Sequence, residues 1–327
     1  NGLVSSTTLN YSDGKGYYEI GGARDALDNG LWVLRSDLSC SSGRTDITGG
    51  VYLSRYDGLH FGDLYRNDAL KQEADVWGRV EWHPVSELGL YADIQYRIVG
   101  HDMHGPDEYG QVLDYALAWD FFNPRAGVSY DFDTHNRVFG SVALGHREPA
   151  RADLQASSSV RPEKMVDTEF GYGFTGERFS ASANVYLMEY HDMLLETGLL
   201  NAGGYAVKEN VDRGWRRGVE LSASWRMSDR LTLSGNASAS TNRFRVGVGT
   251  SAMLLSPSLV AASSVDYSPW RRTAFRYSVK YVGAQYWDNT ECNDRKVPAY
   301  CVSDISASYK FDLGFFGDLE LSAFVNN

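Results

Sequence analysis

The sequence predicts an all-β chain whose antiparallel strands form part of a transmembrane β-barrel, with about 14–16 strands present. Three observations predict this fold class: apolar and polar residues alternate, the alternating runs are long, and short and long connections follow one another. Successive side chains of a strand point to opposite faces, so each alternating run has one apolar and one polar face.

Composition excludes several classes of protein. The chain has 327 residues, 42 acidic and 31 basic side chains, a net charge of −11 and 43% apolar residues. That apolar content excludes disorder for most of the chain. No segment approaches the roughly 18–20 consecutive apolar residues of a membrane-spanning helix. The acidic balance argues against a nucleic-acid partner. The chain does not begin with Met, and its first residues do not resemble a signal peptide. We therefore expect a mature or partial chain.

The alternation is clearest in residues 179–187. Apolar residues occupy the odd positions, and polar or amphipathic ones the even positions: Phe179, Ala181, Ala183, Val185 and Leu187 against Ser180, Ser182, Asn184 and Tyr186. The same period recurs in 88–98, 219–226, 231–240, 275–281, 305–311 and 319–325. These runs of about 9–12 residues suit tilted strands that cross a bilayer. Residues 1–45 are less periodic and predict strand ends with an acidic loop, and 99–123 predicts a polar loop before a short apolar stretch.

The connections between runs differ in length in a regular way. Short turns are expected at 131–136, 175–178, 227–230, 267–271 and 313–318, and long loops at about 146–163, 190–213, 241–257 and 284–298. Short turns on one rim and long loops on the other are typical of outer-membrane barrels. A sandwich with Greek-key crossovers would not keep this rhythm over five hairpins.

The cysteines offer one structural prediction. Cys292 and Cys301 enclose polar turn residues and are predicted to form a disulfide that closes a hairpin tip, the alternative being two free thiols. Cys40 is left without a partner. The sequence has no Cys/His array with zinc spacing, so no metal site is predicted.

Several segments share residues with one family, in the same order and at the same spacing. They are Asn123–Tyr130 with Asn136–Val142, His146–Leu154, Glu163–Tyr172 and Asn210–Leu221, with weaker matches at 256–258, 297–304 and 324–327. Together they resemble the C-terminal barrel portion of TonB-dependent outer-membrane receptors over residues 45–327. The family's N-terminal plug, its partner-binding box and its final strand are not visible in this chain. Residues 1–327 are therefore expected to be the barrel portion of a 22-stranded receptor. Because unpaired edges are untenable in lipid, either this chain is incomplete or other segments complete the barrel.

The resemblance implies a receptor of the bacterial outer membrane that binds a scarce, bulky ligand at external loops and imports it with energy transduced by TonB. An iron–siderophore complex is the first expectation, with haem, cobalamin or a glycan as other ligands. The implied partners are the TonB complex, the small-molecule ligand, outer-membrane lipid and a surface lipoprotein. No enzymatic activity and no cofactor are expected, because no catalytic constellation such as Gly-x-Ser-x-Gly is present. The alternatives are a passive porin-like or adhesin barrel and a soluble all-β glycan-binding protein.

Candidate ligand contacts lie in the predicted long loops. They are His146, Arg147, Arg151, His191, Tyr205, Arg243, Arg245, Tyr286 and Trp287. Arginine and aromatic side chains suit an anionic, ring-bearing chelate through bidentate hydrogen bonds and stacking. The alternative is that Arg147 and Arg151 pair with Glu148, Asp153 or lumen carboxylates. His101 and His104 are expected at a loop surface, since no haem-receptor signature lies beside them.

Overall fold

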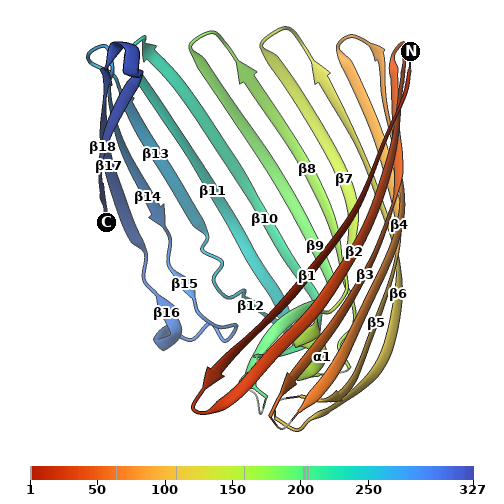
Figure 1. The fold of residues 1–327 in the computed structure, drawn as a ribbon. Coiled ribbons are helices and arrows are strands. Elements are labelled where there is room, and N and C mark those ends of the chain that lie inside the picture. Colours follow the sequence, from red (N-terminus) through yellow and green to blue (C-terminus); the bar gives the residue numbers. More distant parts are fainter. Residues whose placement is uncertain (1, 64, 108, 158, 202–203, 205) are drawn as a thin grey trace. The chain divides into compact units, whose positions relative to one another are not determined.

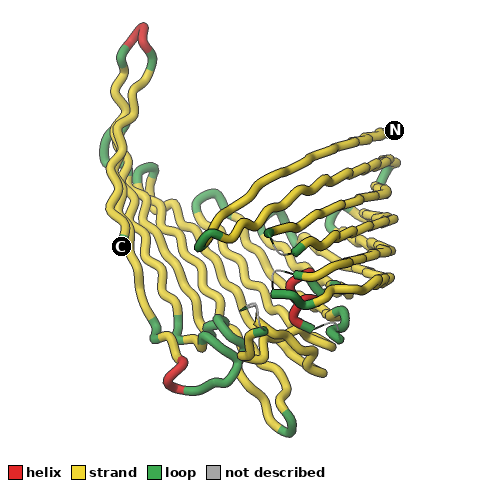
Figure 2. The backbone as a smooth tube through the Cα atoms, turned by 60° about the horizontal axis from the view of Figure 1, so that its bottom comes forward, coloured by secondary structure: helices red, strands yellow, loops and turns green. Residues whose placement is uncertain are grey.

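The computed structural model describes residues 2–63, 65–107, 109–157, 159–201, 204 and 206–327. It confirms the all-β class, because the strands form a 16-stranded antiparallel sheet in which most neighbours in the sheet are also neighbours in the chain. Within the described residues, helix occurs only as α1 (Arg151–Ala156), η1 (Asn293–Arg295) and η2 (Gly314–Phe316), as Figure 2 shows. None of these helices is long and apolar enough to cross a membrane.

The strands are long and follow one another closely. Their bounds are β1 (Leu3–Ile20), β2 (Ala23–Ser42), β3 (Thr45–Gly62), β4 (Arg66–Val85), β5 (Leu88–Pro106), β6 (Val112–Asp131), β7 (Asn136–Arg147), β8 (Glu163–Thr175), β9 (Phe179–Leu200), β10 (Ala206–Ser228), β11 (Leu231–Val246), β12 (Gly249–Ala252), β13 (Leu259–Tyr267), β14 (Thr273–Val282), β15 (Gln285–Tyr286), β16 (Lys296–Val297), β17 (Tyr300–Asp312) and β18 (Asp318–Asn326). The chain divides into two compact units. Unit 1 comprises Asn1–Val128, Val142–Val166 and His191–Asn210, and unit 2 comprises Ser129–Ser141, Asp167–Tyr190 and Val211–Asn327.

In unit 1, strands β1 to β5 pair in chain order (Figure 1), and their register aligns the two faces across the sheet. One transverse row is apolar and consists of Leu9, Leu34, Leu53, Ala74 and Ile98. The row one residue further along is polar and consists of Arg35, Tyr52, Asp75 and Arg97. The apolar side chains are exposed, 67% for Leu9 and 49% for Ile98, and an apolar surface of this extent is characteristic of contact with lipid.

Unit 2 repeats this division of faces. Ser224, Ser234, Ser264, Ser278, Asp304 and Asn326 stand opposite one another from β10 to β18 and form a polar row. The adjacent positions form an apolar row of Trp225, Leu233, Val265, Tyr277, Ile305 and Val325. The period of two that predicted the strands therefore also fixes which side chains share a face.

Strand extents differ from the prediction at three places. Residues 1–45 form the full-length strands β1 and β2 and the start of β3, joined by a tight turn in which Gly21 and Gly22 have positive φ values of 62° and 88°. The predicted loop at 99–123 is the end of β5 and most of β6, and the predicted loop at 190–213 is largely β9 and β10. Beyond the apolar band both faces of a strand meet polar surroundings, so alternation disappears from the sequence while backbone pairing continues. The short turns are confirmed where predicted.

Candidate functional site

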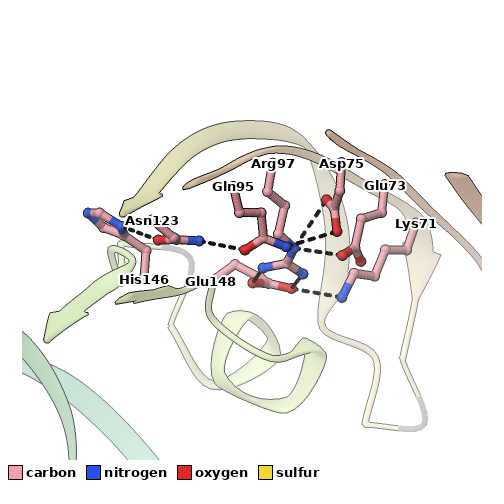
Figure 3. A network of polar contacts seen from close by, with 8 residues as sticks. All are labelled: Lys71, Glu73, Asp75, Gln95, Arg97, Asn123, His146 and Glu148. Carbon is pink, nitrogen blue, oxygen red and sulfur yellow. Dashed lines mark hydrogen bonds and ion pairs between the residues drawn. The ribbon is translucent and has the colours of Figure 1, made fainter. Parts of the chain in front are cut away.

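A polar network covers one face of unit 1 (Figure 3). Alternate residues of β4 place Lys71, Glu73 and Asp75 on this face, and β5 adds Gln95 and Arg97. Arg97 Nε donates to Glu73 Oε1 at 2.6 Å and lies 3.8 Å from Asp75 Oδ1. Gln95 Nε2 donates to Asp75 Oδ2 at 3.2 Å. The guanidinium of Arg97 is therefore held in one orientation by carboxylates from the neighbouring strand.

Glu148, the first residue after β7, binds into this network. Arg97 donates to both carboxylate oxygens of Glu148, at 2.7 and 2.9 Å, and Lys71 Nζ donates to Oε1 at 2.8 Å. The side chains of Arg97 and Glu148 are 16% and 11% exposed. Burial by itself would raise the pKa of the Glu148 carboxyl, but the hydrogen bonds from Arg97 and Lys71 outweigh it and lower the pKa to about 2. Glu148 is consequently ionised at neutral pH.

The network continues through amides to a histidine. Asn123 Nδ2 on β6 donates to Gln95 Oε1 at 3.0 Å, and the Nδ1 of His146 on β7 donates to Asn123 Oδ1 at 2.9 Å. The His146 ring also stacks on Phe121 with a centroid distance of 5.4 Å. His146 is thereby fixed by both a hydrogen bond and ring packing.

A cavity of about 670 Å³ adjoins this network. One side consists of residues 146–151, and the opposite side consists of Tyr56, His60, Ala69, Lys71, Arg97, Val99 and His101. Four cationic side chains line it, Lys71, Arg97, Arg147 and Arg151, against the single carboxylate of Glu148. A concave surface with this excess of positive charge attracts anions, and its guanidinium groups match carboxylate or phosphate geometry.

Residues 148–156, which we call the inner strap, carry α1 and pack against other parts of unit 1. Arg151 donates to Asn67 Oδ1 at 2.8 Å, and Asp153 pairs with Lys208 at 2.8 Å. Leu154 is only 1% exposed, and its apolar neighbours are Val160, Leu194, Tyr115, Leu117 and Trp119. Three of these belong to β6, whose side chains on this face are apolar, which explains why the strap docks there.

The structure brings together three of the predicted ligand residues, His146, Arg147 and Arg151, at this cavity. Arg147 NH2 lies 3.4 Å from Glu163 Oε2, so Arg147 pairs with a carboxylate, as the alternative expected, although with neither Glu148 nor Asp153. Arg151 NH2 donates to Asn67 Oδ1 at 2.8 Å. His191 lies on β9, half-buried and not among the residues that line the cavity. Tyr205 lies outside the described residues.

The other predicted residues belong to unit 2, where one of them, Arg243, links two loops. Arg243 NH2 on β11 donates to Glu291 Oε2 at 2.9 Å and to the Thr250 carbonyl at 3.1 Å. Its guanidinium thus holds the loop around η1 against the β11–β12 hairpin, a structural contact that the sequence did not predict. Arg245 is exposed near the end of β11. Tyr286 forms part of β15, and Trp287, 60% exposed, has the Arg295 guanidinium 5.8 Å from its ring centroid.

The predicted disulfide is absent from the structure, in which Cys292 and Cys301 are both free, as is Cys40. The segment between them is no simple hairpin tip. η1 follows Cys292, and Lys296 and Val297 pair with β15. Cys301 lies within β17, opposite Tyr281 on the exposed face. The regular pairing of β14 with β17 therefore keeps Cys301 in the sheet, where it does not meet Cys292.

Sequence reasoning missed the cavity residues that come from strands. Lys71, His60 and His101 were not proposed, and His101, expected at a loop surface, is 8% exposed and lines the cavity. His104 is exposed as expected, with Nδ1 2.8 Å from Asp114. Arg97 carried a usable signal, because it is a charge in the middle of an alternating strand. Within the described residues, no group of three or more His, Cys, Asp or Glu side chains could hold a metal ion.

Comparisons with known proteins agree with this geometry. The family model described as TonB dependent receptor-like, beta-barrel matches residues 2–327. No curated protein sequence matches the chain. Solved structures that are similar include the ferric-catecholate import receptor Fiu from E. coli K12, with 12% identity and a TM-score of 0.78 over 99% of this chain and 57% of that one. The copper transporter OprC has 15% identity and a TM-score of 0.82, covering 99% and 56%. The ferric yersiniabactin uptake receptor FyuA from Yersinia pestis has 17% identity and a TM-score of 0.73, covering 99% and 53%.

The two faces of the sheet, its consecutively paired antiparallel strands and the family match define an outer-membrane β-barrel protein. More particularly, the chain belongs to the TonB-dependent receptor β-barrel family and is located in the outer membrane of Gram-negative bacteria. We infer from this family that its apolar rows face lipid and its polar rows face the lumen. The chain spans little more than half the length of the solved receptors that it matches.

Proposed function

We propose that residues 1–327 are the barrel portion of a receptor that binds an anionic metal chelate, an iron–siderophore complex first of all, and imports it with energy transduced by TonB. The cationic cavity in unit 1 carries this proposal. Lys71, Arg147 and Arg151 converge there from β4, from the end of β7 and from the segment that follows β7. The similarity of the fold to Fiu, a ferric-catecholate import receptor, and to FyuA, a ferric yersiniabactin uptake receptor, supports the choice of ligand.

The cavity lies toward the long-loop ends of the strands. Lys71 belongs to the half of β4 that is remote from the tight β4–β5 turn, and Arg147 ends β7 at the start of the long connection that contains α1. In this class of barrel, short turns face the periplasm and long loops face the exterior, so a ligand would reach the cavity from outside the cell. The side chains bind and orient the anion, and no covalent step is required.

The apolar rows of both units take outer-membrane lipid as their partner. The region that contacts TonB and the plug that fills the lumen are assigned, in this proposal, to parts of the receptor beyond residues 1–327. Energy transduction would then act on the plug, while the cavity residues supply affinity for the ligand.

Uptake assays on cells that produce the full-length receptor test the proposal. Radioactive iron is supplied as catecholate, hydroxamate and carboxylate chelates, with haem and a corrinoid in parallel, in strains with and without TonB. We expect TonB-dependent uptake of at least one anionic iron chelate. Arg147→Ala combined with Arg151→Ala should weaken its binding at least tenfold, because each removed cation loses a charge-assisted hydrogen bond worth about 1.5–3 kcal/mol.

Arg137→Ala is the matched control, because Arg137 is an exposed arginine of β7 beside the short turn and pairs with Asp131. It should leave binding and uptake unchanged. Uptake that is independent of TonB, or that is confined to uncharged solutes, would contradict the proposal and favour a passive barrel.

A further inference from the structure

The inner strap, residues 148–156, is held in unit 1 by contacts of different kinds. Its Glu148 end is fixed by Arg97 and Lys71 at 2.7–2.9 Å, and its middle by the Arg151–Asn67 and Asp153–Lys208 contacts at 2.8 Å each. The Ala150 N–H donates to Asp153 Oδ2 at 2.9 Å and closes the first turn of α1. Leu154 anchors the helix in an apolar cluster.

The socket for Glu148 is built independently of the strap. Arg97 and Asp75 face each other in the β4–β5 register, and Glu73 fixes Arg97 Nε from the same strand as Asp75. Asn67, which receives Arg151, is itself fully buried and donates to the Pro106 carbonyl at 3.0 Å. Arg97, which binds Glu148, and Asn67, which binds Arg151, are thus oriented by contacts with residues outside the strap. The strap therefore binds to a preformed surface.

Glu148 also divides the cations of the cavity into two groups. Lys71 and Arg97 both donate hydrogen bonds to its carboxylate, whereas Arg147 and Arg151 precede and follow it in the chain and line the cavity. The position of both arginines depends on where Glu148 is held, since residues 147–151 form one continuous stretch of the cavity wall.

We propose that Glu148 is a positioning residue, which latches the inner strap to the lumen wall and so holds Arg147 and Arg151 at the cavity. This deepens the proposed function and rests on it for the identity of the ligand, but the latch itself can be measured without any ligand. Two roles give opposite results. If Glu148 only neutralised charge, its removal would make the cavity more attractive to anions. If it positions the strap, its removal makes the cavity less attractive, although the formal charge rises by one.

The experiment uses the full-length receptor in detergent, with native cysteines replaced by serine and Ala150→Cys as a reporter. Ala150 is exposed and lines the cavity. The rates of thiol modification are compared for an anionic sulfonatoethyl and a cationic trimethylammonioethyl methanethiosulfonate. The parent should react faster with the anionic reagent. Glu148→Gln should reduce the anionic-to-cationic rate ratio at least threefold and increase backbone hydrogen exchange of residues 149–156 at least tenfold.

Glu148→Asp retains the charge, so it should recover part of the rate ratio and part of the protection of residues 149–156 from hydrogen exchange. Glu209→Gln is the matched control, because it removes the same charge from an exposed side chain of β10 that does not line the cavity, and neither value should change. Lys71→Gln removes the ammonium group that binds Glu148 from β4, and it tests the latch if Glu148→Gln does not fold. A rate ratio that rises in Glu148→Gln, with unchanged hydrogen exchange, would overturn the positioning role. Neither readout involves transport, so failure of the uptake assay and failure of the latch are distinguishable.

Discussion

Arginine at position 183 should destabilise the membrane-embedded chain far more than arginine at position 182. Ala183 belongs to the apolar row of β9 and borders an apolar depression of about 510 Å³ on that face, with Leu221, Ala223 and Ala237 nearby. It is the fifth residue of β9. At about 3.3 Å per residue and a strand tilt of about 40°, it lies roughly 10–13 Å from the rim with the short turn, near the middle of an apolar band about 25 Å tall.

An arginine at the bilayer midplane costs about 2–4 kcal/mol. Ser182 points to the opposite face, where its Oγ lies 2.7 Å from Ser222 Oγ beside a polar cavity of about 570 Å³. Ser182→Arg therefore has room and water, and should lose about 1 kcal/mol with that hydrogen bond. The two variants have the same charge and nearly the same depth, so the difference between them isolates the face.

The assay is reversible denaturant unfolding of the full-length protein in lipid vesicles. We expect the free energy of unfolding to fall by about 1–3 kcal/mol more in Ala183→Arg than in Ser182→Arg. Equal losses, or a larger loss in Ser182→Arg, would refute the assignment of the two faces. Ala183→Leu provides a control for volume, and it should cost little because the side chain enters lipid.

Two further predictions concern charge and thiol chemistry. In the folded protein the pKa of the Glu148 carboxyl is lowered from 4.5 to about 2. The ionised carboxyl therefore contributes about 3 kcal/mol to the free energy of unfolding, which is complete above pH 4.5 and is lost as the pH falls toward 2. The free energy of unfolding of the parent should decline over that pH range, and that of Glu148→Gln should decline less. Cys292 is exposed and free, so a maleimide should label it promptly in unreduced protein; protection that only a reductant removes would restore the disulfide originally predicted.

Strands could be predicted from the sequence where the two faces of a strand have different surroundings. Phe179–Leu187 alternates because lipid meets one side and water the other, and β9 begins where that alternation begins. The end of β5, around His101, has no such contrast in the sequence, and it was mistaken for a loop. Backbone pairing does not require alternation, so strand ends beyond the bilayer leave little trace in composition.

The site was predictable in part for a related reason. His146, Arg147 and Arg151 are neighbours in the chain, so a prediction that puts one of them at the start of a loop puts the other two there as well. Lys71 and Arg97 reach Glu148 across 77 and 51 residues of sequence, and their meeting depends on the β4–β5 register and on the path of the strap. Such pairings carry no local signal, and for the same reason the ion pair of Arg243 with Glu291, 48 residues away, was not predictable.

The contacts of Arg97 and Arg147 explain how a lumen face with many charged side chains can still offer a cavity to an anion. A lone buried arginine would be costly, but Arg97 is matched by Glu73 and Asp75 from the wall and by Glu148 from the strap, so its charge is compensated before any ligand arrives. Positive charge remains available at Arg147, whose side chain is 58% exposed and lies 3.4 Å from the Glu163 carboxylate. The Glu163 side chain is only 11% exposed and also accepts the Leu194 N–H at 3.0 Å, so the exposed guanidinium of Arg147 is the part of this pair that an incoming anion would meet. Affinity for an anion should therefore depend more on Arg147 than on the better-matched Arg97, whose exchange for another residue would chiefly loosen the strap.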